Sequence, residues 1–267
     1  MRTTKAAYLF LQSRRAKGLS QKTIKWYGEI LQKFAVSCKD IPKKPERIEQ
    51  FFISLDVGDE RLHGYYRTIK VLYRFLKRRK LIKNNPVEFI EEPRTSNKNP
   101  AVLTPWQLNK ILNQPCNKKI KAALLTFTDT GARLAEVAYL TVDDLIETPD
   151  GFMVIVNGKT GIRLIPISYE TYHALMVNLP FPWSKSHFGR LISQACNNVG
   201  INASALTFRH SFATLWEGDE LILQQIMGHS TLETTKRYRH MRTQNAIKQH
   251  NQHTPLRMVH SFSKSML

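Results

Sequence analysis

The chain of 267 residues has few cysteines, few acidic residues and no long apolar run. Its three cysteines, Cys38, Cys116 and Cys196, lie far apart and form neither a CxxC pair nor a Cys/His metal spacing. This pattern argues against a disulfide framework and predicts buried free thiols. No apolar stretch approaches the length of a membrane-spanning helix, and no signal-type apolar segment follows the first residues. We therefore expect an intracellular, cytoplasmic protein with no membrane contact.

The shortage of acidic residues leaves a large positive charge. There are 21 Asp and Glu against 40 Lys and Arg, which gives a net charge of +19 and an isoelectric point near 10.0. A polyanionic partner is the leading explanation, and a solvated basic surface without a partner is the alternative. Residues 1–99 hold 23 of the basic and only 10 of the acidic residues. We expect this third to bind DNA phosphates with a steep dependence on salt.

The first 90 residues are expected to form a helical domain. Ser20 suits the N-cap of a helix whose apolar residues recur at helical spacing, and a short second helix and a third helix follow before Pro86. Residues 91–103 are polar, proline-bounded and without apolar periodicity, which predicts a linker. A second domain is expected over residues 104–245, with Thr104 as N-cap and Pro105 as the first helical residue. Residues 246–267 are expected to form a tail that could dock on a neighbouring protomer or stay disordered.

The second domain is expected to be mainly α with a small β-hairpin. Two β-like segments flank the turn signal Asn157-Gly158. The stretch 241–267 is polar, rich in His and Gln and weakly periodic. Helices are predicted at about 105–113, 117–129, 132–140, 169–178, 185–199, 207–217, 219–227 and 231–240, and strands at 152–156 and 162–167.

Two arginines of this domain are candidate phosphate clamps. Arg133 begins an apolar helix, and Arg209 sits between Phe208 and Phe212. An arginine in isolation is more often a solvated surface residue, but one beside an apolar face is costly unless it is paired. Glu136 lies three residues after Arg133 and could hold it, or form only a surface ion pair. A planar guanidinium donates two parallel hydrogen bonds to a phosphate and stays charged.

Three further side chains complete a set suited to attack on a phosphodiester. Lys159 is expected at the hairpin tip, where it could protonate a leaving oxygen or simply aid solubility. His229 follows Gly228, an expected helix C-cap, and could donate to a phosphate or only interact with the helix dipole. Tyr238 comes nine residues later among basic neighbours. These neighbours favour the phenolate, although a surface tyrosine would look the same.

Together these segments resemble the tyrosine recombinase family, also called the phage integrase family. Thr-Gly-Ala-Arg133-Leu-Ala-Glu136 is similar to the family's first box, and Gly-Lys159-Thr-Gly-Ile-Arg-Leu-Ile-Pro-Ile to its hairpin lysine segment. Leu-Thr-Phe-Arg209-His-Ser-Phe-Ala-Thr is similar to the second box, and Met-Gly-His229 through Tyr238 to the last segment. The resemblance covers nearly the whole chain, since residues 1–90 look like the family's core-binding (SAM-like) domain.

The resemblance implies a site-specific recombinase, an integrase of phage or mobile-element origin that needs no metal and no other cofactor. It implies that Tyr238 attacks the scissile phosphate and leaves a 3′-phosphotyrosyl link, while Arg133 and Arg209 hold the non-bridging oxygens. It further implies that Lys159 protonates the leaving oxygen, that His229 donates to the phosphate, and that Glu136 supports the site. The implied partners are double-stranded DNA at a specific site, further copies in a tetramer on two sites, and accessory DNA-bending proteins.

One position departs from the family pattern. The second box normally has a histidine three residues before its arginine, and Leu206 stands there. Family members commonly carry a histidine at the position of His210 as well, so His210 is no obvious replacement. We favour an active enzyme, because the other catalytic residues remain. The alternatives are a catalytically impaired DNA-binding relative and a nicking enzyme similar to type IB topoisomerases.

Overall fold

The computed structural model describes residues 1–95, 101–158, 161–228 and 239–257. It divides the chain into two compact units, Met1–Lys98 and Asn99–Leu267, and each unit is described by itself. In the described ranges no helix is long and apolar enough to cross a membrane. The candidate residues Lys159, His229 and Tyr238 lie outside the described residues.

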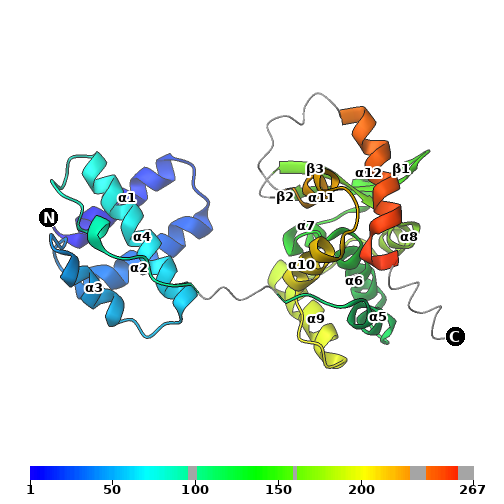
Figure 1. The fold of residues 1–267 in the computed structure, drawn as a ribbon, viewed down its shortest axis with the longest axis horizontal. Coiled ribbons are helices and arrows are strands. Elements are labelled where there is room, and N and C mark those ends of the chain that lie inside the picture. Colours follow the sequence, from blue (N-terminus) through cyan, green and yellow to red (C-terminus); the bar gives the residue numbers. More distant parts are fainter. Residues whose placement is uncertain (96–100, 159–160, 229–238, 258–267) are drawn as a thin grey trace. The chain divides into compact units, whose positions relative to one another are not determined.

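The first unit is entirely helical (Figure 1). Ser20 caps the second helix as expected, since its side chain accepts a hydrogen bond from the backbone of Thr23 at 3.3 Å. The first helix lies in the stretch expected to be helical, although no local pattern singled it out. The elements are α1 (Thr3–Ala16), α2 (Gln21–Ser37), α3 (Pro45–Ile53), α4 (Asp59–Arg78) and the short 3-10 helix η1 (Pro86–Phe89).

Aromatic side chains form much of the core of the first unit. Phe34 packs edge-on against Phe51 with ring centroids 5.0 Å apart, and the buried hydroxyl of Tyr73 donates to the carbonyl of Pro42 at 2.9 Å. The chain after η1 returns to α4, where Glu92 lies 3.0 Å from the ammonium of Lys70. Glu92 falls within the stretch expected to be linker, yet its ion pair attaches it to this unit.

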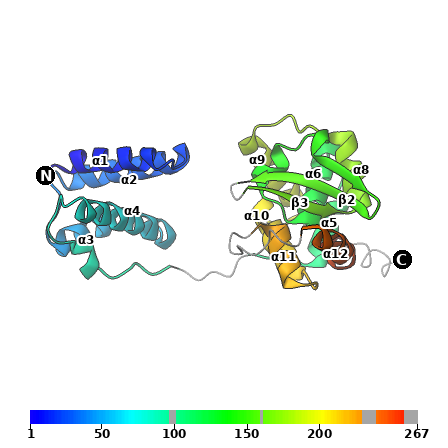
Figure 2. The ribbon, with the colours of Figure 1, turned by 90° about the horizontal axis from the view of Figure 1, so that it is seen from above.

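The second unit is built around α6 (Lys118–Thr130), whose residues 122–130 are all buried. Helices α5, α8, α9 and α10 pack against it, and so does the last strand of the sheet (Figure 2). The expected cap is present, because Thr104 and Gln107 form a capping box. The other helices are α5 (Pro105–Asn113), α7 (Leu134–Ala138), the 3-10 helix η2 (Val142–Asp144), α8 (Tyr169–Asn178), α9 (Lys185–Asn198), α10 (Ala205–Leu215), α11 (Glu220–Met227) and α12 (Arg239–His253).

The sheet is antiparallel in the order β1 (Leu145–Thr148), β2 (Gly151–Gly158) and β3 (Gly161–Ile167). This three-stranded sheet in a mainly helical unit confirms the expected fold class. Two details of the prediction were wrong. The four-residue β1 was not predicted, and Asn157 and Gly158 belong to β2, since Gly158 pairs with Gly161.

The last described helix corrects a further expectation. No helix was predicted after residue 240, but α12 runs to His253. Apolar burial explains only part of its docking, through side chains such as Ala246 and Ile247. The buried His250 contributes a polar contact, with its Nε2 atom 2.6 Å from the carbonyl oxygen of Asp129. This part of the tail therefore packs on its own chain, and docking in trans stays a prediction.

Candidate active site

The C-terminal end of α6 forms the turn that positions Arg133, the first candidate phosphate-binding arginine. Gly131 ends the helix in the left-handed conformation with φ +59°, and a Cβ there would lie 2.8 Å from the ring of Phe212. Only glycine suits both the conformation and the space. The chain then turns so that Arg133 is the N-cap of α7, with extended backbone. The helix predicted at 132–140 is therefore shorter, and Arg133 stands at its entrance.

Glu136 holds Arg133 at two points. The backbone N–H of Arg133 donates to Oε2 of Glu136 at 2.7 Å, and its Nη1 donates to Oε1 at 3.0 Å. The side chain of Glu136 is fully buried, whereas that of Arg133 is 32% exposed. The expected pairing of these two residues is present, and the exposed guanidinium remains accessible to a ligand.

Arg163 is a third residue of this cluster, and no role was predicted for it from the sequence. It lies on β3 and forms a two-pronged pair with Glu136, with Nη1 to Oε1 at 2.7 Å and Nη2 to Oε2 at 2.9 Å. Its position carried one signal. Arg163 shares a strand face with the buried Ile165 and Ile167, so an inward partner was to be expected.

The charge of Glu136 is fixed by these contacts. Burial alone would raise the pKa of the carboxyl group, but hydrogen bonds from Arg163 and from Arg133 outweigh it and lower the pKa to about 2. The carboxylate is therefore ionised at any physiological pH. The backbone of β2 passes close by, because a Cβ on Gly158 would collide with Oε1 of Glu136.

Arg209 reaches the same place from α10. It is 7% exposed, and its guanidinium donates to the carbonyls of Gly131 at 3.0 Å and Met227 at 2.6 Å. Burial lowers the pKa of Arg209 to about 10, with the nearby charges of Arg133 and Arg163 adding to the effect. Among the described residues, Arg133 and Arg163 share the carboxylate of Glu136, and Arg209 lies close enough to be affected by all three charges. Three guanidinium groups beside one carboxylate leave a net positive cluster suited to an anion.

The C-terminal end of α11 closes the cluster. Gly228 caps this helix in the left-handed conformation with φ +62°, as expected from the sequence. A Cβ on Gly228 would lie 3.0 Å from Cδ of Arg163, so the backbone passes directly against that side chain. The structure thus brings together Arg133, Glu136 and Arg209. It does not test the placement of the other three candidates.

Leu206 is at the surface. It lies in the first turn of α10 and is 60% exposed, while His210 on the same helix is half-buried. A side chain at position 206 therefore faces solvent or a ligand and takes no part in the core. A histidine would fit there without repacking.

The first unit carries a separate basic face on α4. His63, Lys70 and Lys77 are paired with Glu92 and Glu88 along one side of the helix. The exposed Arg67, Arg74 and Arg78 lie at helical spacing in an adjoining row, and they form none of the ion pairs found in the described residues. This row of charges suits a phosphate backbone.

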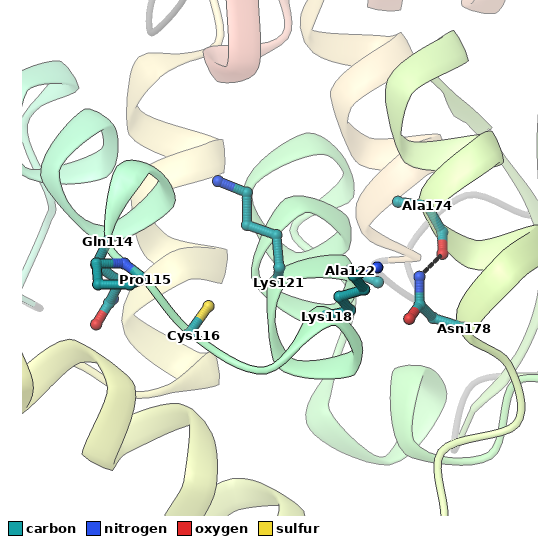
Figure 3. Close-up of a pocket in the computed structure, with 8 residues that line it drawn as sticks. All are labelled: Gln114, Pro115, Cys116, Lys118, Lys121, Ala122, Ala174 and Asn178. Atoms are coloured by element: carbon teal, nitrogen blue, oxygen red, sulfur yellow. Dashed lines mark hydrogen bonds between the residues drawn. The ribbon is translucent and has the colours of Figure 1, made fainter.

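An open cavity of about 330 Å³ elsewhere in the second unit is not the candidate site (Figure 3). It is lined by residues of the loop between α5 and α6, by α6 and by α8, among them Cys116, Lys121 and Asn178. None of the clustered arginines lines it. Within the described ranges no group of three or more His, Cys, Asp or Glu side chains could hold a metal ion.

Comparisons with known proteins show which proteins this chain is similar to. No protein-family model matches the chain. Tyrosine recombinase XerD of Chlamydia muridarum is 28% identical over 222 residues, covering 70% of this chain and 72% of the relative. Tyrosine recombinase XerD of Halalkalibacterium halodurans is 27% identical over 268 residues, covering 84% of this chain and 89% of the relative.

Solved structures share the fold. Lambda integrase bound to DNA matches with a TM-score of 0.72 at 18% identity, over 91% of this chain and 96% of the other. XerH site-specific recombinase bound to its difH substrate matches with a TM-score of 0.66 at 19% identity, over 88% of this chain and 81% of the other. Taken together, the curated relatives and the shared fold show that this chain is similar to tyrosine recombinases.

Proposed function

We propose that this protein is a site-specific DNA recombinase that cleaves and rejoins DNA through a 3′-phosphotyrosyl intermediate. The observation that carries the proposal is the convergence of Arg133 and Arg209 on the turn at Gly131. Arg209 donates to two carbonyls, and an arginine has five N–H groups, so donors remain for a phosphate oxygen. Two preorganised guanidinium groups would stabilise charge that develops on the scissile phosphate.

The proposed reaction conserves the energy of the phosphodiester. Tyr238 attacks as the phenolate after its proton passes to solvent, its oxygen forms a bond to phosphorus, and the bond from phosphorus to the 5′ oxygen breaks. Lys159 gives a proton to that oxygen, and His229 donates to the phosphate. The 5′ hydroxyl of a partner strand then reverses the attack and releases the tyrosine. These roles fit the described flanks, because His229 directly follows the Gly228 cap and α12 begins one residue after Tyr238.

The assembly and location follow from the same proposal. Double-stranded DNA is the partner, with the basic face of α4 contacting phosphates in the first unit, which acts as the core-binding domain. Lambda integrase is known as a tetramer bound to a Holliday junction. We infer that four copies of this chain assemble on two DNA sites in the cytoplasm, with DNA-bending proteins as possible accessories.

Leu206 favours a second candidate function. A leucine neither donates to a phosphate nor carries a proton, so the chain could bind DNA without cleaving it. The two candidates differ in one observable, which is the covalent bond between Tyr238 and DNA.

The test uses nicked duplexes that trap the covalent intermediate. The full chain first selects its site from a pool of duplexes that includes DNA flanking its gene. Wild-type protein and Tyr238→Phe are then incubated with that site, and SDS-resistant adducts and gel shifts are measured. An adduct with wild type alone supports the recombinase. Specific binding by both without an adduct supports the non-catalytic relative. Relaxation of supercoiled plasmid that lacks the site would favour a topoisomerase-like enzyme instead.

A further inference from the structure

Arg163 has more polar contacts than its place on a hairpin strand requires. Its three nitrogens all donate, two to Glu136 and Nε to the carbonyl of Ile226 at 2.8 Å. The side chain thereby joins β3 to α7 and to the last turn of α11, elements that are far apart in the sequence. It is 11% exposed, so it is poorly placed to contact DNA itself.

Only arginine can make this set of contacts. A planar guanidinium offers two parallel donors to the carboxylate and a third from Nε, whereas lysine has a single nitrogen. Glu136 in turn uses both oxygens twice, once toward Arg163 and once toward Arg133. The orientation of Glu136, and therefore of the Arg133 guanidinium, depends on the two hydrogen bonds that Arg163 donates to Glu136.

We propose that Arg163 is a positioning residue for DNA cleavage, which acts by holding Glu136 so that Glu136 aims Arg133 at the scissile phosphate. This inference rests on the proposed recombinase function. A purely structural role is the competing explanation. Removing one partner of a buried ion pair destabilises a protein, so the test needs a measurement that a loss of stability alone would not change.

The distinguishing test replaces the charge that Arg133 would clamp. In a methylphosphonate, a methyl group stands in place of one non-bridging oxygen, so the phosphorus centre is neutral and the clamp has less charge to stabilise. Single-turnover cleavage by the full chain is measured on the selected DNA site with a normal phosphate and with each methylphosphonate stereoisomer. DNA affinity and melting temperature are measured alongside.

The variants separate geometry from charge and from folding. Arg163→Met removes the hydrogen bonds to Glu136 and Ile226, and Arg163→Lys keeps the charge but cannot donate two parallel hydrogen bonds to the carboxylate. Lys110→Met is the matched control, since it removes one exposed charge from α5 in the same unit. Should Arg163→Met fail to fold, the double variant Arg163→Met/Glu136→Gln takes its place, because it leaves no unpaired buried carboxylate.

We expect Arg163→Met and Arg163→Lys to slow cleavage of the normal phosphate by about 10²-fold, the scale of a small misplacement of a catalytic group. DNA affinity should be unchanged, and Lys110→Met should cleave like wild type. On at least one methylphosphonate stereoisomer, the difference in cleavage rate between wild type and variant should shrink to a few-fold. Two results would overturn this inference and leave the proposed function standing. One is an equal ratio of wild-type to variant cleavage rates on all substrates, and the other is no difference in rate on the normal phosphate. If wild type forms no adduct on a site that it binds, the proposed function fails and this inference fails with it.

Discussion

The buried carboxylate of Glu136 makes the stability of the second unit depend on acid in a way that can be calculated. Its pKa is about 2 in the folded protein, against an ordinary value of 4.5. This difference corresponds to about 3 kcal/mol of folding free energy. Because the folded pKa is the lower one, this stabilisation is fully present above pH 4.5. It is lost as the pH falls through 4.5 toward 2.

The variant Glu136→Gln removes this charge and leaves two guanidinium groups without their carboxylate. Breaking a buried pair by removing one partner costs about 3 to 5 kcal/mol, so the variant should be less stable than wild type by that amount at pH 7. In acid the wild-type carboxylate also loses its charge. The difference between the two proteins should therefore narrow by about 3 kcal/mol between pH 5 and pH 2.

Urea unfolding followed by tryptophan fluorescence measures this difference. Three of the four tryptophans, Trp106, Trp183 and Trp216, lie in the second unit, so the signal reports mainly on it. The control is Glu147→Gln, which neutralises an exposed carboxyl group on β1 of the same unit and should change stability by less than about 0.5 kcal/mol. If the difference in free energy of unfolding between wild type and Glu136→Gln stays constant with pH, the conclusion that Glu136 is an ionised carboxylate bound by arginine is refuted.

The features that could be predicted from the sequence are contacts between residues close together in the chain. The pairing of Arg133 with Glu136 is set by a spacing of three residues. The cap at Gly228 is set by a residue that tolerates positive φ, and the cap at Thr104 by its own first turn. Each of these contacts closes within one helical turn, so the local residues determine it.

The contacts that the sequence could not predict join residues distant in the chain. Arg163 lies 27 residues from Glu136 and 63 from Ile226, and nothing local indicates either partner. The docking of α12 is similar, because it depends on His250 meeting a carbonyl 121 residues earlier. A polar helix without an apolar stripe carries no periodic signal, although buried polar contacts can hold it in place.

Three further variants probe the turn, the second box and the last helix. Gly131→Ala should destabilise the unit by at least about 1 to 2 kcal/mol, because φ is positive there and the ring of Phe212 occupies the space; the melting temperature measures it. Leu206→His should leave that temperature unchanged, since the site is 60% exposed, and should speed adduct formation by up to about 10²-fold if a general acid–base is missing. Thr254→Val tests how α12 is held. The hydroxyl of Thr254 donates to the buried carboxylate of Asp129 at 2.8 Å, so its loss should cost about 1 to 3 kcal/mol. Since α12 begins directly after Tyr238, the exchange of its amide hydrogens should rise and adduct formation should fall together. Faster exchange with undiminished adduct formation would mean that docking of this helix does not position the tyrosine.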